Sequence, residues 1–425
     1  MTGSRRRCGL VGVGLVLTSA VGCGEDEPPS EDVAFNAPTW SATEELRIGS
    51  LDDPDRALTT VDQVAVGPDE TLYVPQPQDH EIRVYDRAGA LVDILGGEGG
   101  GPEEFGSLSA MDVFDDGLIV VDGGNGRVSR ITWDGEFLDS HRWDGGMESH
   151  EEGEHSSMFM WDYPMAAVGL NDGDALVKPN SGFALTDAIV EAERLDMAIP
   201  APFLRVDEEG ALVDTVLWVE DVSSQVAVER GGDRYRVASP LVDDPLHALA
   251  VAEPGVVSVE WSPDQEEAPT DSFTVTSRGL DGQVAWSRSY AYAPVPMTEG
   301  RLTDILEGRE PFPADPGAAP DEPDPPPVDD QIAALQAHGL VPHHHPPITD
   351  LVTTQDGSVW LRREDDSPDD ATWNVVSGDD GEPLGQVTLP AGQEVLAAEG
   401  DLLVVLEEDA FDVPYVITYR LDRAD

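Results

Sequence analysis

Two neighbouring stretches of the chain repeat the same alternation of apolar and polar residues. In each copy, four short alternating runs are separated by turns rich in Asp and Gly. The runs are Val64–Val66, Leu72–Val74, Glu81–Tyr85 and Leu91–Leu95 in the first copy, and Met111–Val113, Leu118–Val121, Arg127–Ile131 and Phe137–Ser140 in the second. Val64 and Met111 stand 47 positions apart, and Gly89 and Gly135 stand 46 apart. Short strands that recur at this period are typical of the four-stranded blades of a β-propeller.

Looser copies of this unit follow along the chain. Blades 3 to 6 are predicted at Met165–Trp218, His247–Tyr290, Ile348–Leu389 and Val395–Tyr419. The sixth blade shows only three strands, whereas an orphan strand stands near the N-terminus at Glu44–Ser50. We therefore predict an all-β fold: a six-bladed β-propeller over residues 44–425, closed by the N-terminal strand, which completes the last blade. Closure would remove the exposed sheet edges that an open array leaves.

A helical and Pro-rich insertion, at about residues 297–347, interrupts the repeat between blades 4 and 5. Helices are predicted at Glu299–Leu306 and Gln331–His338, with an extended or disordered Pro-rich stretch between them. We expect this insertion to lie over one face of the ring, as a functional lid or as a decoration without function.

Several motifs resemble a known repeat family. Asp79–Asp86, with the sequence DHEIRVYD, and Asn125–Val128 resemble the strand of NHL repeats, and the loop ending in Gly101–Phe105 is similar to their connector. The later segments resemble the six-bladed propeller lipoproteins of environmental bacteria. The resemblance covers most of residues 44–425, strongly in the first two blades and loosely afterwards. Some relatives by fold are lyases or lactone hydrolases with a metal on the propeller axis, but their ligand pattern is not matched in this sequence.

The N-terminus carries the pattern of a bacterial export signal. Arg5–Arg7 precede the apolar run Cys8–Gly22, which is too short for a stable membrane span but suits the core of a signal peptide. Ala20–Cys23 resembles the lipobox, so residues 1–22 are predicted to be a lipoprotein signal peptide and Cys23 the lipidated residue. Ordinary secretion with cleavage nearby is the alternative. Gly24 resembles the sorting pattern for the outer membrane of the cell envelope.

After this signal, the acidic and Pro-bearing residues 23–43 are predicted to form a flexible tether. The two cysteines of the chain are Cys8 and Cys23, so a mature lipidated chain has no disulfide to form. We therefore expect a monomer that is stabilised by packing.

The chain of 425 residues has a formal net charge of −61. So large a negative charge argues against nucleic acid or anionic lipid as a direct partner, and leaves the lipid anchor as the expected contact with the membrane. The charge fits cation binding, basic partners or adaptation to a salty medium, in which surface charges are screened.

Histidines supply the candidate metal ligands. His343, His344 and His345 stand in a Pro-stiffened loop before the fifth blade. Neighbours on a strand point to opposite sides, but two of the three could face one ion from a loop. His150 and His155 flank an acidic stretch whose spacing differs from the HExxH motif of zinc proteases. This stretch could bind a divalent metal, calcium or zinc, or could be a solvated acidic loop.

Catalytic motifs are absent from the sequence. It contains no nucleophile elbow, kinase signature, dinucleotide fingerprint or EF-hand loop. Asp112, His247 and Asp350 are the polar candidates on predicted inner strands. Two hypotheses follow. The first is a non-catalytic envelope lipoprotein that binds a protein, peptide or glycan on the axial face of the propeller. The alternative is a metal-dependent periplasmic or surface hydrolase or lyase that uses the histidines.

Overall fold

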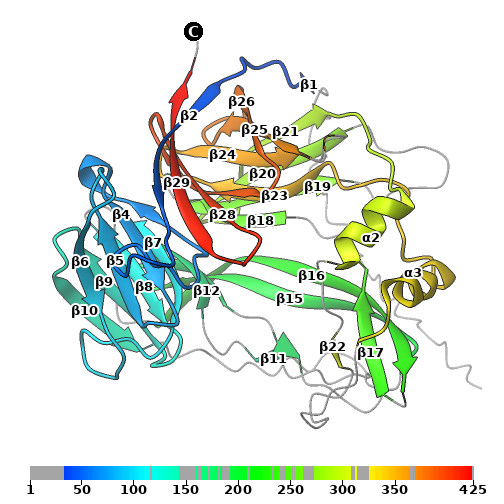
Figure 1. The fold of residues 1–425 in the computed structure, drawn as a ribbon, viewed down its shortest axis with the longest axis horizontal. Coiled ribbons are helices and arrows are strands. Elements are labelled where there is room, and N and C mark those ends of the chain that lie inside the picture. Colours follow the sequence, from blue (N-terminus) through cyan, green and yellow to red (C-terminus); the bar gives the residue numbers. More distant parts are fainter. Residues whose placement is uncertain are drawn as a thin grey trace, which may run out of the picture.

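The computed structural model describes most of the chain after residue 32. The described residues are 33–114, 117–142, 159–160, 164–170, 173–179, 182–183, 192–207, 211–231, 233–239, 246–250, 252, 254–261, 272–307, 312–313, 325–363, 367 and 369–423. They form an all-β, propeller-like fold built from antiparallel sheets, most of them four-stranded, with two helices at one side (Figure 1).

The first two sheets coincide with the two sequence copies. The first sheet contains β3 (Ala65–Val66), β4 (Leu72–Gln76), β5 (Glu81–Tyr85) and β6 (Leu91–Gly96), with the short 3-10 turn η1 (Pro68–Glu70) after β3. The second contains β7 (Leu108–Phe114), β8 (Gly117–Asp122), β9 (Arg127–Thr132) and β10 (Phe137–Arg142). In both sheets each strand pairs with the next one along the chain, so both are simple meanders. Local alternation of apolar residues was sufficient to predict these strands.

The third sheet is larger than its predicted blade. It contains β12 (Pro164–Gly169), β13 (Ala175–Pro179), β15 (Arg194–Val206), β16 (Leu212–Arg230), β17 (Asp233–Ala238) and β22 (Phe312–Pro313). The hairpin of β15 and β16 continues far beyond a blade, with Arg194 paired to Val226. A separate two-stranded pair joins β11 (Phe159–Met160) to β14 (Gly182–Phe183).

The remaining sheets follow the predicted order. The fourth contains β18 (Leu246–Ala250), β19 (Gly255–Trp261), β20 (Ser272–Gly279) and β21 (Val284–Ala291). The fifth contains β23 (Ile348–Thr353), β24 (Ser358–Arg363), β25 (Asp370–Ser377) and β26 (Pro383–Pro390). The last contains β27 (Gln393–Glu399), β28 (Leu402–Glu408) and β29 (Pro414–Asp422), together with β2 (Ser41–Ile48) from the N-terminus. β2 runs antiparallel to β29, from Ser41 opposite Asp422 to Ile48 opposite Val416.

Residues 33–43, which the sequence analysis assigned to the flexible tether, pack against the protein instead. β1 (Val33–Ala34) adds in parallel to the edge of β21. Trp40 is 5% exposed, and its backbone N–H donates to the carbonyl of Gln386 on β26 at 2.7 Å. Burial of the Trp40 ring outweighs the polar composition of the surrounding segment. The predicted tether therefore does not include residues 33–43, and its remaining residues, 23–32, lie outside the described part of the chain.

Hydrophobic clusters join the sheets in pairs. Six clusters each combine side chains of two sheets that follow one another in the chain or, in one case, of the last and first sheets. That last cluster brings Leu72 and Val74 of the first sheet together with Val404 and Val416 of the last. Side chains of these clusters exclude water from both faces of most sheets, which is the main stabilising term of the fold.

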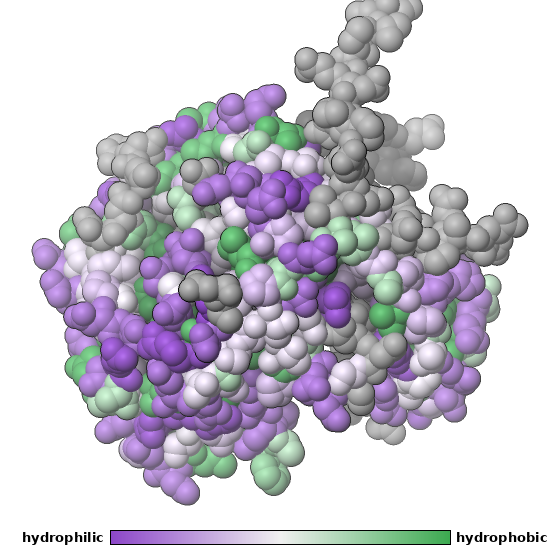
Figure 2. Space-filling model, turned by 90° about the horizontal axis from the view of Figure 1, so that it is seen from above, coloured by the Kyte–Doolittle hydropathy of each residue, from purple (hydrophilic) through white to green (hydrophobic). Residues whose placement is uncertain are grey.

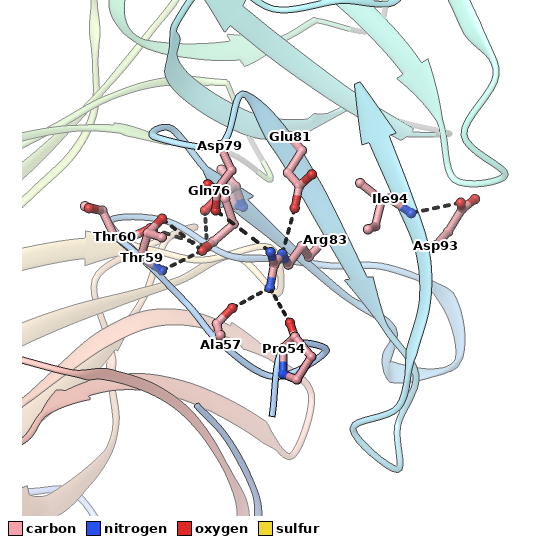
Figure 3. A network of polar contacts seen from close by, with 11 residues as sticks. Pro54, Ala57, Thr59, Thr60, Gln76, Asp79, Glu81, Arg83, Asp93 and Ile94 are labelled. Atoms are coloured by element: carbon pink, nitrogen blue, oxygen red, sulfur yellow. Dashed lines mark hydrogen bonds and ion pairs between the residues drawn. The ribbon is translucent and has the colours of Figure 1, made fainter. Parts of the chain in front are cut away.

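A polar network holds the link between the last and first sheets (Figure 3). The guanidinium of Arg83, on β5, donates to the carbonyls of Pro54 and Ala57 and to the carboxylate of Glu81. The side chain of Gln76 accepts a hydrogen bond from the backbone N–H of Thr59 at 2.8 Å. The loop after β2 is therefore pinned to β4 and β5 by side chains.

The insertion packs on the extended part of the third sheet. α2 (Glu299–Glu307) and α3 (Val328–Ala337) match the two predicted helices closely. Their apolar faces share one cluster with residues of β16 and β17, among them Leu302, Leu335, Val226 and Val237. Figure 1 shows both helices near β16 and β17, away from β4 to β10. Within the described residues, neither helix is long and apolar enough to cross a membrane.

Candidate ligand-binding cavity

A cavity of about 160 Å³ lies between the inner strands, by which we mean the first strand of each sheet. Four sheets contribute to it: the first, the second, the fifth and the last. Its lining residues are Gln63, Val64, Ala65, Met111, Asp112, Val113, Thr353, Thr354, Gln355, Leu396 and Ala397. We call this space the inner-strand cavity. Segments more than 300 residues apart in sequence therefore meet around one space.

Two glutamines close the strand edges that face the inner-strand cavity. The backbone N–H of Val66 donates to Oε1 of Gln355 at 3.1 Å, and Nε2 of Gln355 donates back to the carbonyl of Val66 at 2.9 Å. The backbone N–H of Met111 donates to Oε1 of Gln63 at 2.6 Å. An inner strand has a partner on one side only, so these side chains satisfy backbone groups that would otherwise be left bare.

Asp112, on β7, is the titratable residue of the lining. Its Oδ1 atom accepts a hydrogen bond of 2.7 Å from the backbone N–H of Val113. Burial raises the pKa of the Asp112 carboxyl to about 7, against the opposing effect of that one hydrogen bond. The carboxyl therefore changes its charge close to neutral pH, inside a space that could hold a ligand.

The two threonines of the lining bond within the protein. The hydroxyl of Thr353 donates to the carbonyl of Leu249, which joins the fifth sheet to the fourth. The hydroxyl of Thr354 lies 2.8 Å from Oδ1 of Asp356 and 2.8 Å from the hydroxyl of Ser358. The Thr354 hydroxyl therefore holds the turn after β23 that places Gln355 at the cavity.

The other inner-strand candidates do not line this space. Asp350, on β23, accepts a hydrogen bond of 2.8 Å from the N–H of Leu351, and burial raises its pKa. His247, on β18, lies with its ring centre 6.2 Å from that of Phe203. Sequence reasoning thus named Asp112 correctly as an inner-strand polar residue, but gave no reason to prefer it to Asp350 or His247.

The loop of three histidines is held by its backbone to the segment before α2. The N–H of Met297 donates to the carbonyl of His343 at 2.8 Å, and the N–H of His345 donates to the carbonyl of Val295 at 2.9 Å. His343 is exposed, His344 is half-buried and His345 is 6% exposed. Burial, with a smaller contribution from the charge of Arg301, lowers the pKa of His345 to about 4.

These histidines do not assemble a metal centre with their described neighbours. In the part of the chain that the structure describes, no three His, Cys, Asp or Glu side chains lie close enough together to hold an ion. His150, His155 and Cys23 lie outside the described residues. The metal site predicted from the histidines therefore stays a prediction.

The sequence gives no signal for the glutamines at the cavity. Gln63 stands before an ordinary apolar run, and Gln355 occupies an ordinary turn between Thr354 and Asp356. Their roles depend on contacts with distant strands, such as the 289 positions that separate Val66 from Gln355.

Comparisons with known proteins add little to this geometry. No family model and no curated protein sequence matches the chain. Among solved structures, a protein described as exported from Bacteroides fragilis aligns with a TM-score of 0.44 and 10% identity, covering 92% of this chain and 100% of its own. A member of the DUF4221 family from Bacteroides vulgatus aligns with a TM-score of 0.45 and 11% identity, with the same coverage.

A third structure is an inactive variant of virginiamycin B lyase from Staphylococcus aureus. It aligns with a TM-score of 0.32 and 9% identity, covering 92% of this chain and 98% of its own. Likenesses at these scores carry no inference about the function of this chain.

Proposed function

We propose that this chain is an exported, lipid-anchored, six-bladed β-propeller that binds a protein, peptide or glycan at the inner-strand cavity, without carrying out a reaction. The observation that carries the proposal is the cavity itself, because inner strands of four sheets and the side chains of Gln63, Asp112 and Gln355 converge on it. Ligand sites are concave and carry a few placed polar groups. The lining of this cavity is more polar than apolar, and its side-chain polar groups come from Gln63, Asp112, Thr353, Thr354 and Gln355.

A closed ring of six blades is part of the proposal. It is supported by the pairing of β2 with β29 in the last sheet and by the hydrophobic cluster that joins this sheet to the first. A closed ring holds its inner strands rigidly around a central space, which preorganises a binding site.

The anchor is proposed from the N-terminal sequence. Lipid on Cys23 would place the propeller at the outer membrane of a bacterial envelope, as a monomer on a tether that ends before residue 33. Replacement of Cys23 by Ser should abolish incorporation of labelled palmitate and move the protein from the membrane fraction to the soluble fraction. Palmitate incorporation that persists in Cys23→Ser would contradict the anchor.

Binding is tested with a panel of synthetic peptides and oligosaccharides, read out by calorimetry and by hydrogen exchange. A ligand of the cavity should slow exchange in the inner strands β3, β7, β23 and β27. Leu396→Trp, which fills the cavity from its wall, should lower affinity by roughly tenfold or more, because a displaced ligand loses its buried contacts. Leu384→Trp is the matched control, since Leu384 is 38% exposed on β26 and does not line the cavity. Two results would refute the proposal. One is a ligand that slows hydrogen exchange only in strands other than these four, and the other is equal ligand affinity of Leu396→Trp and Leu384→Trp.

A further inference from the structure

The hydrogen-bond donors of the inner-strand cavity are largely engaged within the protein. The side-chain amide of Gln355 donates to Val66, and the hydroxyl of Thr353 donates to Leu249. The hydroxyl of Thr354 lies within hydrogen-bond distance of Asp356 and Ser358. A ligand that arrives with hydrogen-bond acceptors therefore finds few donors to meet them.

The Asp112 carboxylate can accept more hydrogen bonds than the described residues give it. An ionised carboxylate offers about four lone-pair positions, and within the described residues Asp112 accepts the single hydrogen bond from Val113. None of the eleven lining residues carries a positive charge. Asp112 is half-buried, and an ionised carboxylate that is partly removed from water is costly without a cation beside it, so a positively charged ligand would stabilise its ionised form.

The charge of the whole molecule favours the same class of ligand. With a formal net charge of −61, the protein attracts cations and repels anions at long range. An anionic ligand would meet repulsion twice, first from the surface and then from Asp112.

The size of the cavity limits what can enter. A volume of about 160 Å³ corresponds to roughly five water molecules and is smaller than the pockets of about 300–1,000 Å³ that hold drug-sized ligands. Val64, Met111 and Leu396 supply apolar wall beside the carboxylate. A compact charged head on an aliphatic stem fits such a space, and a primary ammonium is compact, with three N–H donors, whereas a guanidinium is broad and planar.

We propose that the inner-strand cavity binds a primary ammonium group on an aliphatic stem, with the Asp112 carboxylate accepting its N–H hydrogen bonds. This inference rests on the proposed function, because it names the part of the ligand that enters the same cavity. The ammonium comes from a small alkyl amine or from a lysine side chain of a partner, which offer the same chemistry.

The test uses n-butylammonium chloride and the purified protein in calorimetry at about pH 8, where Asp112 is ionised and the amine is protonated. 1-Butanol and butyrate should bind at least about tenfold more weakly, because neither brings a positively charged donor to the carboxylate. Asp112→Asn should lower affinity for the amine by a similar factor. Asp112→Ala is a second variant, and the melting temperature of each variant shows whether it is folded.

Asp350→Asn is the matched control. Asp350 also lies on an inner strand and accepts the N–H of the next residue, but it does not line the cavity. This variant should bind the amine as the native protein does. A short acetylated peptide containing lysine, compared with its acetyl-lysine and arginine counterparts, then distinguishes the two sources of the ammonium.

Three results would overturn the proposal: butanol or butyrate binding as tightly as the amine, undiminished amine binding in both Asp112 variants, or Asp112-dependent binding of calcium that excludes the amine. Peptide or glycan binding that Leu396→Trp abolishes and Asp112→Asn leaves intact would refute the ammonium site and keep the proposed function. A protein that binds no amine, peptide or glycan would refute both.

Discussion

At the scale of single residues, two charged side chains of the first two sheets hold the fold together. Arg83, in the motif that resembles an NHL strand, binds backbone carbonyls of the loop before the first sheet. Asp122 is fully buried, and its carboxylate accepts the N–H groups of Gly106, Ser107 and Asn125. Buried polar groups of this kind need partners, and here backbone groups of connecting loops provide them. These two side chains are thus explained by the construction of the first two sheets, whereas Asp112 lines the inner-strand cavity.

The raised pKa of Asp112 predicts a pH-dependent stability. Because the pKa rises from 3.8 to about 7 on folding, the folded protein holds this proton more tightly than the unfolded chain. The stabilising contribution is fully present below about pH 4 and is lost as pH rises through about 7. Asn does not titrate, so Asp112→Asn does not lose this stability as pH rises. The free energy of unfolding of the variant minus that of the native protein should therefore increase between pH 4.5 and pH 8, by at most about 4 kcal/mol.

Urea unfolding of both proteins at the two pH values measures this difference. No other lining residue of the cavity titrates, so the change belongs to Asp112. If the difference in free energy of unfolding between the native protein and Asp112→Asn does not change with pH, the Asp112 carboxyl is solvated in the folded protein.

Gly385, on β26, is predicted to tolerate no side chain. A Cβ atom placed there would lie 2.0 Å from Cε2 of Trp40, whose ring also packs edge-on against Trp360. Gly385→Ala should therefore lower the free energy of unfolding by roughly 1–3 kcal/mol, because an overpacked core must shift. Gly392→Ala is the control, since a Cβ atom at Gly392 meets nothing within 4 Å. Equal melting temperatures for the two variants would contradict this packing.

At the scale of elements, the N-terminal residues 33–48 contact three sheets in turn, and we call this segment the strap. β1 pairs with β21 of the fourth sheet, residues around Trp40 bond to β26 of the fifth, and β2 completes the last. Ile48, at the end of β2, is fully buried in the cluster that joins the last sheet to the first. An edge strand without its neighbour exposes backbone donors and acceptors, so β29 depends on β2.

A synthetic peptide should restore the cooperative unfolding that the protein loses when the strap is removed. A chain that begins at Gly49 is expected to lose cooperative unfolding and to aggregate, because β29 becomes an open edge and the core beneath Ile48 is exposed. Addition of a synthetic peptide with residues 33–50 should restore a cooperative thermal transition in calorimetry. The same peptide with Ile48→Asp should fail to do so. A truncated chain that melts like the full-length protein would show that β2 is dispensable.

At the scale of the whole molecule, negative charge is the dominant property. Figure 2 shows hydrophilic side chains over most of the view from above. Most of the described ion pairs, such as Arg420 with Glu45 and Glu70, lie in part-exposed positions. Single pairs of this kind contribute little each, so they do not offset the repulsion among the many carboxylates.

The net charge of −61 predicts that salt stabilises the protein. The melting temperature should rise by several degrees between about 10 mM and about 1 M NaCl, because the screening length falls from roughly 30 Å to 3 Å. The rise should shrink at about pH 4.5, where carboxylates begin to take up protons. Differential scanning calorimetry at both pH values tests this expectation. A melting temperature that falls with salt would show that attractive pairs outweigh repulsion.

The alternation of apolar residues by itself determined the all-β class, the strands of the first two sheets and the pairing of an N-terminal strand with the last sheet. The first two features depend on residues that are neighbours in the chain. The third follows because the repeat has four strands and its last copy shows only three. The sequence did not reveal the long hairpin of β15 and β16, because residues 181–199 are rich in Ala and acids and show no alternation. It also misassigned residues 33–43, where Trp40 finds a buried place only once β26 has formed.

Tertiary structure alone decided which polar residues meet. Asp112, Gln63 and Gln355 come from distant segments, and nothing local distinguishes Asp112 from Asp350, which makes the same bond to its own neighbour. The register of the strands and the joining of the last sheet to the first place one aspartate at a cavity and leave the other away from it. The physical reason is that local pattern sets secondary structure, whereas a site is formed by contacts between strands far apart in the chain.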